Sequence, residues 1–131
     1  MSKKRYLESN VLTESKKRVS YIFDNFEKYY ISFSGGKDST VMMHLVLEEA
    51  IKRNKTVGVL IIDLEAQYKH TIDHIREVIE MYKDNIDLHW FCGEILLRNA
   101  VSDFQPKWAA WDSDNENIWV REKPKTSPRY Y

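Results

Sequence analysis

Apolar residues recur along this chain with two different periods, and the two periods alternate. Where apolar side chains return every three or four residues, as at Val19, Ile22 and Phe26, the pattern predicts an amphipathic helix. The unbroken apolar run 57–62 is typical instead of a central parallel strand buried on both faces. The predicted elements, in order, are a helix from Thr13, a strand at 29–33, a helix at 39–53, a strand at 57–62, a helix at 68–82 and a strand at 87–91.

Helices and strands that alternate in this order predict an α/β fold with a parallel, twisted sheet flanked by helices. Parallel strands need right-handed crossovers, and ligands of such sheets bind beyond the carboxyl ends of the strands. The helix at 39–53 is expected to turn one apolar face toward the sheet. That face is predicted to carry Val41, Met42, Leu45, Val46 and Ala50.

The chain changes character after the last predicted strand. The apolar segment 95–104 predicts a short helix, and three tryptophans, Trp108, Trp111 and Trp119, then lie close together in the sequence. Such a cluster either stacks a base, forms a partner surface or closes a small core. We therefore expect a single domain, 1–131, divided into an N-terminal helix (1–28), a core (29–92) and a Trp-rich segment with a tail (93–131).

The segment 32–40 has the chemistry of a phosphate-binding turn. It follows a predicted strand and leads into a helix through Gly35 and Gly36. A helix N-terminus exposes backbone N–H groups that an anion can accept, and glycine lets the backbone approach the anion closely and tolerates a positive φ. Lys37 adds a mobile positive charge. The segment thus predicts a site for a phosphorylated ligand.

Neither common nucleotide-binding signature fits this segment. A Walker A loop needs a glycine at the position of Ile31 and a hydroxyl side chain at the position of Asp38, and a GxGxxG pattern is absent. The loop resembles instead, residue for residue, the SGGxDS loop of the PP-loop ATP pyrophosphatases, the adenine nucleotide alpha-hydrolase superfamily. The matching residues are Ser34, Gly35, Gly36, Asp38 and Ser39.

The resemblance is narrower when the rest of the chain is included. The segment 62–68 and the later Trp119–Arg121 look like the phosphoadenosine phosphosulfate (PAPS) reductase and ATP sulfurylase small-subunit branch, and most like the phage- and prophage-borne members related to the regulator IbrA. This resemblance implies a nucleotidyl-transfer type of chemistry at the α-phosphate of ATP or a sulfonucleotide. It also implies that the loop residues hold the phosphates and that Asp63, with neighbours such as Glu65, lies near the adenosine. The loop residues concerned are Ser32, Ser34, Gly35, Gly36, Lys37, Asp38, Ser39 and Thr40.

Lys37 and Asp38 are the candidate catalytic residues. Displacement of pyrophosphate builds negative charge on the departing phosphates, and Lys37 is placed to stabilise it. Asp38 cannot help an anion directly, so it either binds a Mg²⁺ that bridges to the phosphates or caps the helix that follows.

Three further residues follow predicted strand ends on the same edge as the loop: Asp63, Glu65 and Cys92. The two carboxylates either line the same crevice as the loop or cap the next helix. We expect Cys92 to be a packing residue, since a catalytic thiol needs an activating neighbour. His70 and His74 share a helix face, but without an HExxH pattern they are weak candidates for a metal site.

Composition limits the remaining possibilities. The chain has 20 basic and 20 acidic residues, so no overall field favours nucleic acid or membrane, although Lys16-Lys17-Arg18 is locally basic. A single cysteine excludes an internal disulfide and argues against an iron–sulfur cluster within the chain, and we expect a cytoplasmic protein with no membrane partner.

Two departures from the family leave three hypotheses open. The chain lacks the C-terminal Glu-Cys-Gly motif of true PAPS reductases. The sequence after the third predicted strand is also too short for the further strands that usually complete this sheet. The first hypothesis is an adenine nucleotide-binding PP-loop protein that is active alone or with a partner subunit or second copy that completes the sheet. The second is a non-catalytic regulator that is gated by the nucleotide. The third is an inactive, truncated paralogue.

Overall fold

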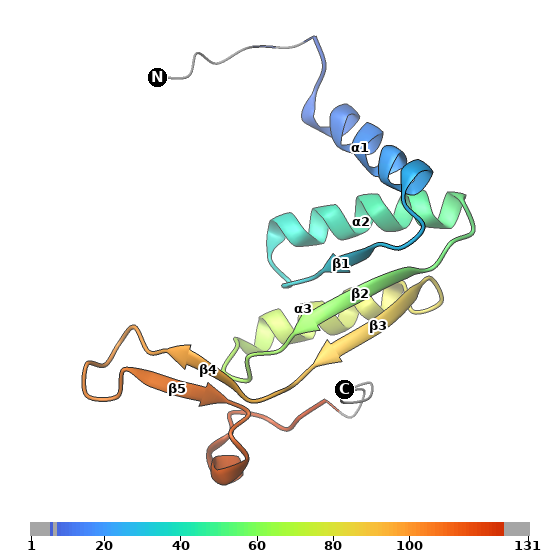
Figure 1. Cartoon of the computed structure of the whole chain (residues 1–131). Helices are drawn as coiled ribbons and strands as arrows, with labels where there is room; N and C mark the ends of the chain where they lie inside the picture. The colour runs from blue at the N-terminus through green and yellow to red at the C-terminus, as the bar shows by residue number, and fades with distance from the viewer. Residues whose placement is uncertain (1–5, 7, 125–131) are drawn as a thin grey trace.

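The computed structural model describes residue 6 and residues 8–124. Three helices alternate with three strands and are followed by a two-stranded hairpin (Figure 1). The elements are α1 (Val11–Asn25), β1 (Tyr30–Ser32), α2 (Lys37–Lys52), β2 (Val57–Ile62), α3 (Lys69–Met81), β3 (Ile86–Phe91), β4 (Ile95–Arg98), β5 (Lys107–Ala110) and the 3₁₀ helix η1 (Ser113–Ile118).

The first three strands form one parallel sheet in the order β1-β2-β3, which confirms the predicted α/β fold with a parallel sheet and flanking helices. Tyr30 pairs with Gly58, and Gly58 pairs with Asp87, so β2 is the central strand and β1 lies at one edge. The loop that follows β1 therefore lies at the carboxyl edge of the sheet, where ligands of parallel α/β sheets bind.

Helices α2 and α3 lie side by side against one face of the sheet. Two contacts join them: Thr40 Oγ1 lies 2.9 Å from His74 Nε2, and the phenolic oxygen of Tyr82, which follows α3, lies 2.5 Å from His44 Nδ1. The strand side chains on this face are buried and form the core with the helices. They are Ile31, Val57, Val59, Ile61 and Trp90.

The other face of the sheet is open in the described part of the chain, which corrects one prediction. The central strand was expected to be buried on both faces, but Leu60 is half-buried and Ile62 is 49% exposed. Tyr30 and Phe91, on the neighbouring strands, are exposed on the same face. The apolar run of β2 thus reflects its central position and not cover on both sides.

A second correction concerns the buried face of α2. The core side chains are Met43, Leu47 and Ala50, whereas Val41 is 59% and Met42 is 42% exposed. Val46 and Ala50 contact the core as predicted, but Met43 and Leu47 take the places expected for Val41, Met42 and Leu45. Apolar residues occupy 41–43 and 45–47, so the pattern alone fits more than one face of this helix. The exposed pair lies on the side of α2 that faces α1.

Helix α1 is held on α2 by polar contacts. Arg53, the C-cap of α2, donates 2.6 Å and 2.7 Å hydrogen bonds to Asp24 Oδ1 and Ser20 Oγ of α1, and it also binds Glu49 of α2. Phe23 of α1 is buried, and the centre of its ring lies 5.4 Å from Cζ of the Arg53 guanidinium. These contacts define the position of α1 relative to α2.

The segment after β3 differs from the predicted helix at 95–104. Its first part is strand β4, which pairs antiparallel with β5 through Leu97 and Trp108. The tryptophans close a small core, which was one of the interpretations of the sequence. Trp111 is 1% exposed, and its ring centre lies 5.1 Å from that of Trp119 in an edge-to-face contact. In the described part of the chain, no helix is both long and apolar enough to cross a bilayer.

Candidate functional site

The turn between β1 and α2 depends on Gly35. Its φ is +75°, a left-handed value that residues with a Cβ rarely adopt. A Cβ at this position would lie 2.7 Å from Ile75 Cγ1 and 3.1 Å from Thr71 Cγ2, so α3 packs directly against the turn. The glycine therefore meets both a backbone and a packing requirement.

Gly36 caps helix α2 and gathers hydrogen bonds on its carbonyl oxygen. The hydroxyls of Ser39 and Thr40 donate to it at 3.0 Å and 2.8 Å, and the Thr40 N–H donates at 2.9 Å. The hydroxyls of Ser34 and Ser39 lie 3.0 Å apart across the turn. The serines and Thr40 thus brace the turn from inside.

The backbone N–H groups of the first turn of α2 remain available. Within the part of the chain that the structure describes, those of Lys37, Asp38 and Ser39 make no hydrogen bond. They point out of the helix N-terminus, where the helix dipole adds partial positive charge. This arrangement can bind an anion without any rearrangement of the backbone.

Lys37 and Asp38 stand at the mouth of this turn. Their side chains are 88% and 90% exposed and form an ion pair of 2.7 Å. An ion pair so exposed contributes little to stability, so both groups can exchange partners when a charged ligand arrives. The Asp38 carboxylate makes no cap hydrogen bond to α2, whose N-cap is Gly36.

A histidine that sequence analysis did not assign to the site braces the turn from α3. His74 Nε2 lies 2.9 Å from Thr40 Oγ1, and Thr40 donates its hydroxyl hydrogen to Gly36. Thr40 therefore accepts from His74, which fixes a hydrogen on Nε2. The turn is supported on one side by Ile75 packing and on the other by this hydrogen-bonded chain.

Asp63 lies at the carboxyl end of β2 and is completely buried. Its Oδ2 accepts a 2.8 Å hydrogen bond from Trp90 Nε1, and its Oδ1 accepts from the backbone N–H of Glu65 at 2.8 Å and from the guanidinium of Arg121. Its backbone oxygen accepts from Trp111 Nε1 at 2.8 Å. Both carboxylate oxygens are thus occupied by protein donors.

Glu65, which follows Asp63 closely in the chain, has a similar role, with φ at +62° and 6% of its surface exposed. Its carboxylate accepts the backbone N–H groups of Trp111 at 3.0 Å and Val120 at 3.1 Å. Its backbone oxygen accepts from Arg121 Nε at 3.0 Å. The two carboxylates fasten the C-terminal segment to the same sheet edge that carries the glycine turn.

Cys92 is buried as well, 1% exposed, beside Asp63. Burial, with the nearby negative charge of Asp63, raises the pKa of this thiol from 9.0 to about 12. The structure therefore agrees with the expectation that Cys92 is a packing residue. Among the described residues, no group of three or more His, Cys, Asp or Glu side chains is arranged to hold a metal ion.

The raised thiol pKa leads to a prediction. We expect iodoacetamide to leave Cys92 unmodified at pH 8 in the folded protein and to alkylate it quickly once the chain is unfolded in guanidinium. Since the folded pKa lies above the unfolded one, the stability linked to Cys92 is fully present below pH 9.0 and is lost as pH rises toward about 12. Mass spectrometry is unambiguous because the chain has one cysteine. Fast alkylation under native conditions would contradict the burial.

The fold and the carboxyl-edge glycine turn define a Rossmann-like parallel α/β domain in which helix α2 begins directly after the turn. The chain belongs to the phosphoadenosine phosphosulfate reductase domain family, whose model matches residues 28–124. It is also 36% identical over 126 residues to the uncharacterised protein YbdN of Escherichia coli strain K12. That match covers 93% of this chain and 30% of YbdN, so the chain spans about a third of the length of this curated relative.

Proposed function

We propose that the domain binds an adenine nucleotide, ATP or a sulfonucleotide, through the turn 34–40 and acts on its α-phosphate. The observation that carries this proposal is the row of unpartnered N–H groups at Lys37, Asp38 and Ser39, presented by the left-handed Gly35 at the carboxyl edge of the sheet. Membership in the family supports a nucleotide as the ligand.

The chemistry of the turn suits the leaving group of such a reaction. When pyrophosphate departs from an α-phosphate, negative charge builds on the bridging oxygen and the outgoing phosphates. Backbone N–H groups and the Lys37 ammonium stabilise that charge, and fixed donors of this kind contribute a few kcal/mol each, about 3 kcal/mol where measured. The serine hydroxyls inside the turn keep these donors in place.

Asp38 fits a role as a ligand of Mg²⁺. Magnesium ions at nucleotide sites are commonly held by one or two carboxylates together with phosphate oxygens, and the exposed Asp38 carboxylate stands beside the anion-binding N–H groups. A bound Mg²⁺ would neutralise phosphate charge during the reaction. Asp38 would then hold the metal in place of its ion pair with Lys37, and the Lys37 ammonium would be free to bind the phosphates.

For Asp63 and Glu65 we propose a positioning role near the nucleotide. Their oxygens hold the segment 111–121 against the sheet edge, and the adenosine then lies against the surface that this segment forms. Thiol-dependent reduction does not belong to the proposal. Cys92, the single cysteine, is buried with its pKa raised to about 12.

Calorimetric titration with ATP and Mg²⁺, combined with an assay for released pyrophosphate, tests this function. We expect binding by the unaltered chain and a loss of at least about tenfold in affinity, about 1.4 kcal/mol, for Lys37→Ala combined with Asp38→Ala. The matched control is Lys83→Ala combined with Glu80→Ala, an exposed ion pair at the C-terminal end of α3, far from the turn, that should leave binding unchanged.

The outcomes separate the hypotheses. Binding with pyrophosphate release supports an enzyme, and binding without release supports a nucleotide-gated regulator or a subunit that needs a partner. A folded chain that does not bind the nucleotide contradicts the proposal.

A further inference from the structure

One basic residue of α1 acts on Glu14, one turn earlier, through its charge alone and makes no direct polar contact in the described part of the chain. In the run Lys16-Lys17-Arg18, Lys16 pairs with Glu48 of α2 at 3.3 Å and Lys17 pairs with Glu14 at 2.9 Å. Arg18 makes no ion pair or hydrogen bond with any described residue. Its positive charge is therefore available to a ligand.

Arg18 lies in a groove that reaches the phosphate-binding turn. The groove, of about 430 Å³, runs between α1 and the first two turns of α2, and both Arg18 and Asp38 line it. Its walls include Val41 and Met42, two exposed apolar residues of α2 that lie outside the core. One cavity thus joins the free guanidinium to a residue of the turn.

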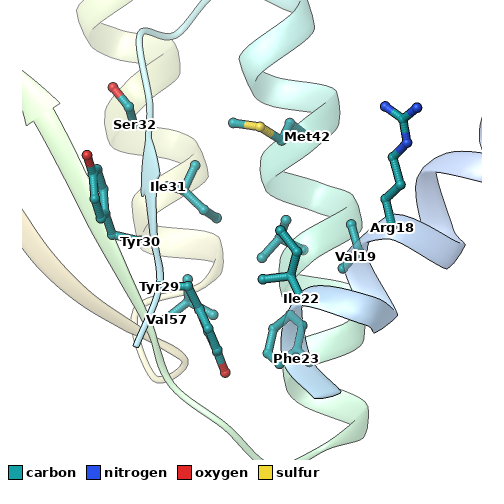
Figure 2. Close-up of a pocket in the computed structure, with 11 residues that line it drawn as sticks. Arg18, Val19, Ile22, Phe23, Tyr29, Tyr30, Ile31, Ser32, Met42 and Val57 are labelled. Carbon is teal, nitrogen blue, oxygen red and sulfur yellow. The ribbon is translucent and has the colours of Figure 1, made fainter. Parts of the chain in front are cut away.

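Arg18 also lines a second groove, of about 410 Å³, which reaches the carboxyl end of β1. It runs along the free edge of β1 under α1, and Ser32 lines it two residues before the turn begins. Figure 2 shows the side chain of Arg18 extending from α1 toward the end of this groove at which Met42 and Ser32 lie. The guanidinium therefore points along α2 toward its N-terminus and not toward the apolar floor.

The position of Arg18 is fixed by the scaffold. Helix α1 is attached to α2 through Arg53, whose guanidinium binds Asp24 and Ser20, and through Lys16 and Glu48. The backbone of Arg18 is therefore held in place, and sites built on helices are more precise than sites on loops.

The side chains of the turn supply too little positive charge to balance a triphosphate without a further cation such as Arg18. Lys37 and Asp38 neutralise each other, so before any metal binds the side chains of the turn carry no net charge. A triphosphate brings up to four negative charges, more than the helix N-terminus and Lys37 can balance. Arginine suits a phosphate group because its planar guanidinium can donate two parallel hydrogen bonds.

Resting on the proposed nucleotide site, we propose that Arg18 binds the terminal phosphate of the nucleotide that the turn 34–40 holds, and so selects triphosphates over monophosphates. The turn binds the inner phosphates through its N–H groups, and Arg18 reaches the outer phosphate from α1 across the groove. The contact lies in a solvent-open groove, so added salt weakens it.

Titrations of ATP and AMP in the presence of Mg²⁺ test this role. For Arg18→Ala we expect the Kd for ATP to rise about tenfold while the Kd for AMP changes less than twofold, which collapses the preference for ATP. Arg18→Lys keeps the charge without the planar fork and should recover some of that preference. The matched control is Lys17→Ala, a neighbouring cation on the same helix, which should leave both constants unchanged.

The results distinguish this inference from the proposed function. If the unaltered chain binds ATP and Arg18→Ala binds it equally well, or weakens ATP and AMP alike, the role of Arg18 is wrong and the nucleotide site stands. If the unaltered chain binds neither nucleotide, both proposals are wrong. Equal losses for Lys17→Ala and Arg18→Ala also overturn the inference, because they would reflect the general charge of α1.

Discussion

Substitution of Gly35 by alanine is expected to destabilise the domain and to abolish nucleotide binding together. The new Cβ would meet Ile75 Cγ1 at 2.7 Å, and the backbone would have to keep a φ of +75°. Left-handed backbone strain in a residue with a Cβ costs about 1–3 kcal/mol, and the clash adds to it. Thermal unfolding measures the first effect, and titration with ATP and Mg²⁺ measures the second.

Two variants separate the components of this effect. Gly36→Ala should leave the melting temperature nearly unchanged, because its Cβ would meet only Ser34 Oγ, at 3.5 Å, and its φ of −76° suits any residue. Ile75→Ala removes a buried core side chain and has a cost of its own, so the clash is measured by a double-mutant cycle: Gly35→Ala should cost less in the Ile75→Ala background than in the unaltered chain, and the strain should remain. A Gly35→Ala protein with unaltered stability and unaltered affinity would show that the turn does not have this geometry.

Substitution of Asp63 by alanine is expected to produce the largest loss of stability. It removes the acceptor of Trp90 Nε1 and the Glu65 N–H, and it leaves the guanidinium of Arg121 without its buried partner. Removal of one member of a buried ion pair typically costs about 3–5 kcal/mol because the other charge remains buried. Denaturant unfolding, followed by tryptophan fluorescence, measures this loss directly.

The control for Asp63 is Asp87→Ala, an exposed aspartate of β3 whose carboxylate, among the described residues, is hydrogen-bonded only to His89. That variant should stay within about 0.5 kcal/mol of the unaltered chain. If Asp63→Ala reduced nucleotide affinity without reducing stability, Asp63 would be a direct ligand of the nucleotide and the positioning role would be wrong.

Much of the fold was predictable because, in most segments, the period of the apolar residues and the length of the segment indicate the same kind of element. The runs 29–33, 57–62 and 87–91 became the three parallel strands within one residue at each end. The helix expected at 95–104 was wrong because a short apolar segment fits helix or strand equally well, and only its pairing with β5 decides between them. The buried face of α2 was mispredicted in part because apolar residues occupy 41–43 and 45–47, so the pattern does not decide which of them face the sheet.

The geometry of the candidate site was predictable where it depends on neighbouring residues. In the turn 34–40, Gly35 has the left-handed φ that its sequence predicted, and the first N–H groups of α2 are left without backbone partners; nucleotide binding by this turn stays a prediction. Arg121 and His74 were missed because each acts on a residue more than 30 positions away, Asp63 and Thr40 respectively. Even the Trp119–Arg121 segment, which contributed to the family resemblance, carried no signal of that partner.

The backbone of the glycine turn offers the most direct test of nucleotide binding. The chain has four glycines, at 35, 36, 58 and 93, and the structure describes all of them. In ¹H–¹⁵N spectra of the glycine amides, we expect ATP with Mg²⁺ to shift the signals of Gly35 and Gly36, with little change at Gly58, in the middle of the sheet. Gly58 is the reference signal, because Gly93 follows β3 at the same carboxyl edge as the turn. Spectra that stay unchanged at saturating ATP, or that shift only at Gly93, would contradict a nucleotide site in the turn.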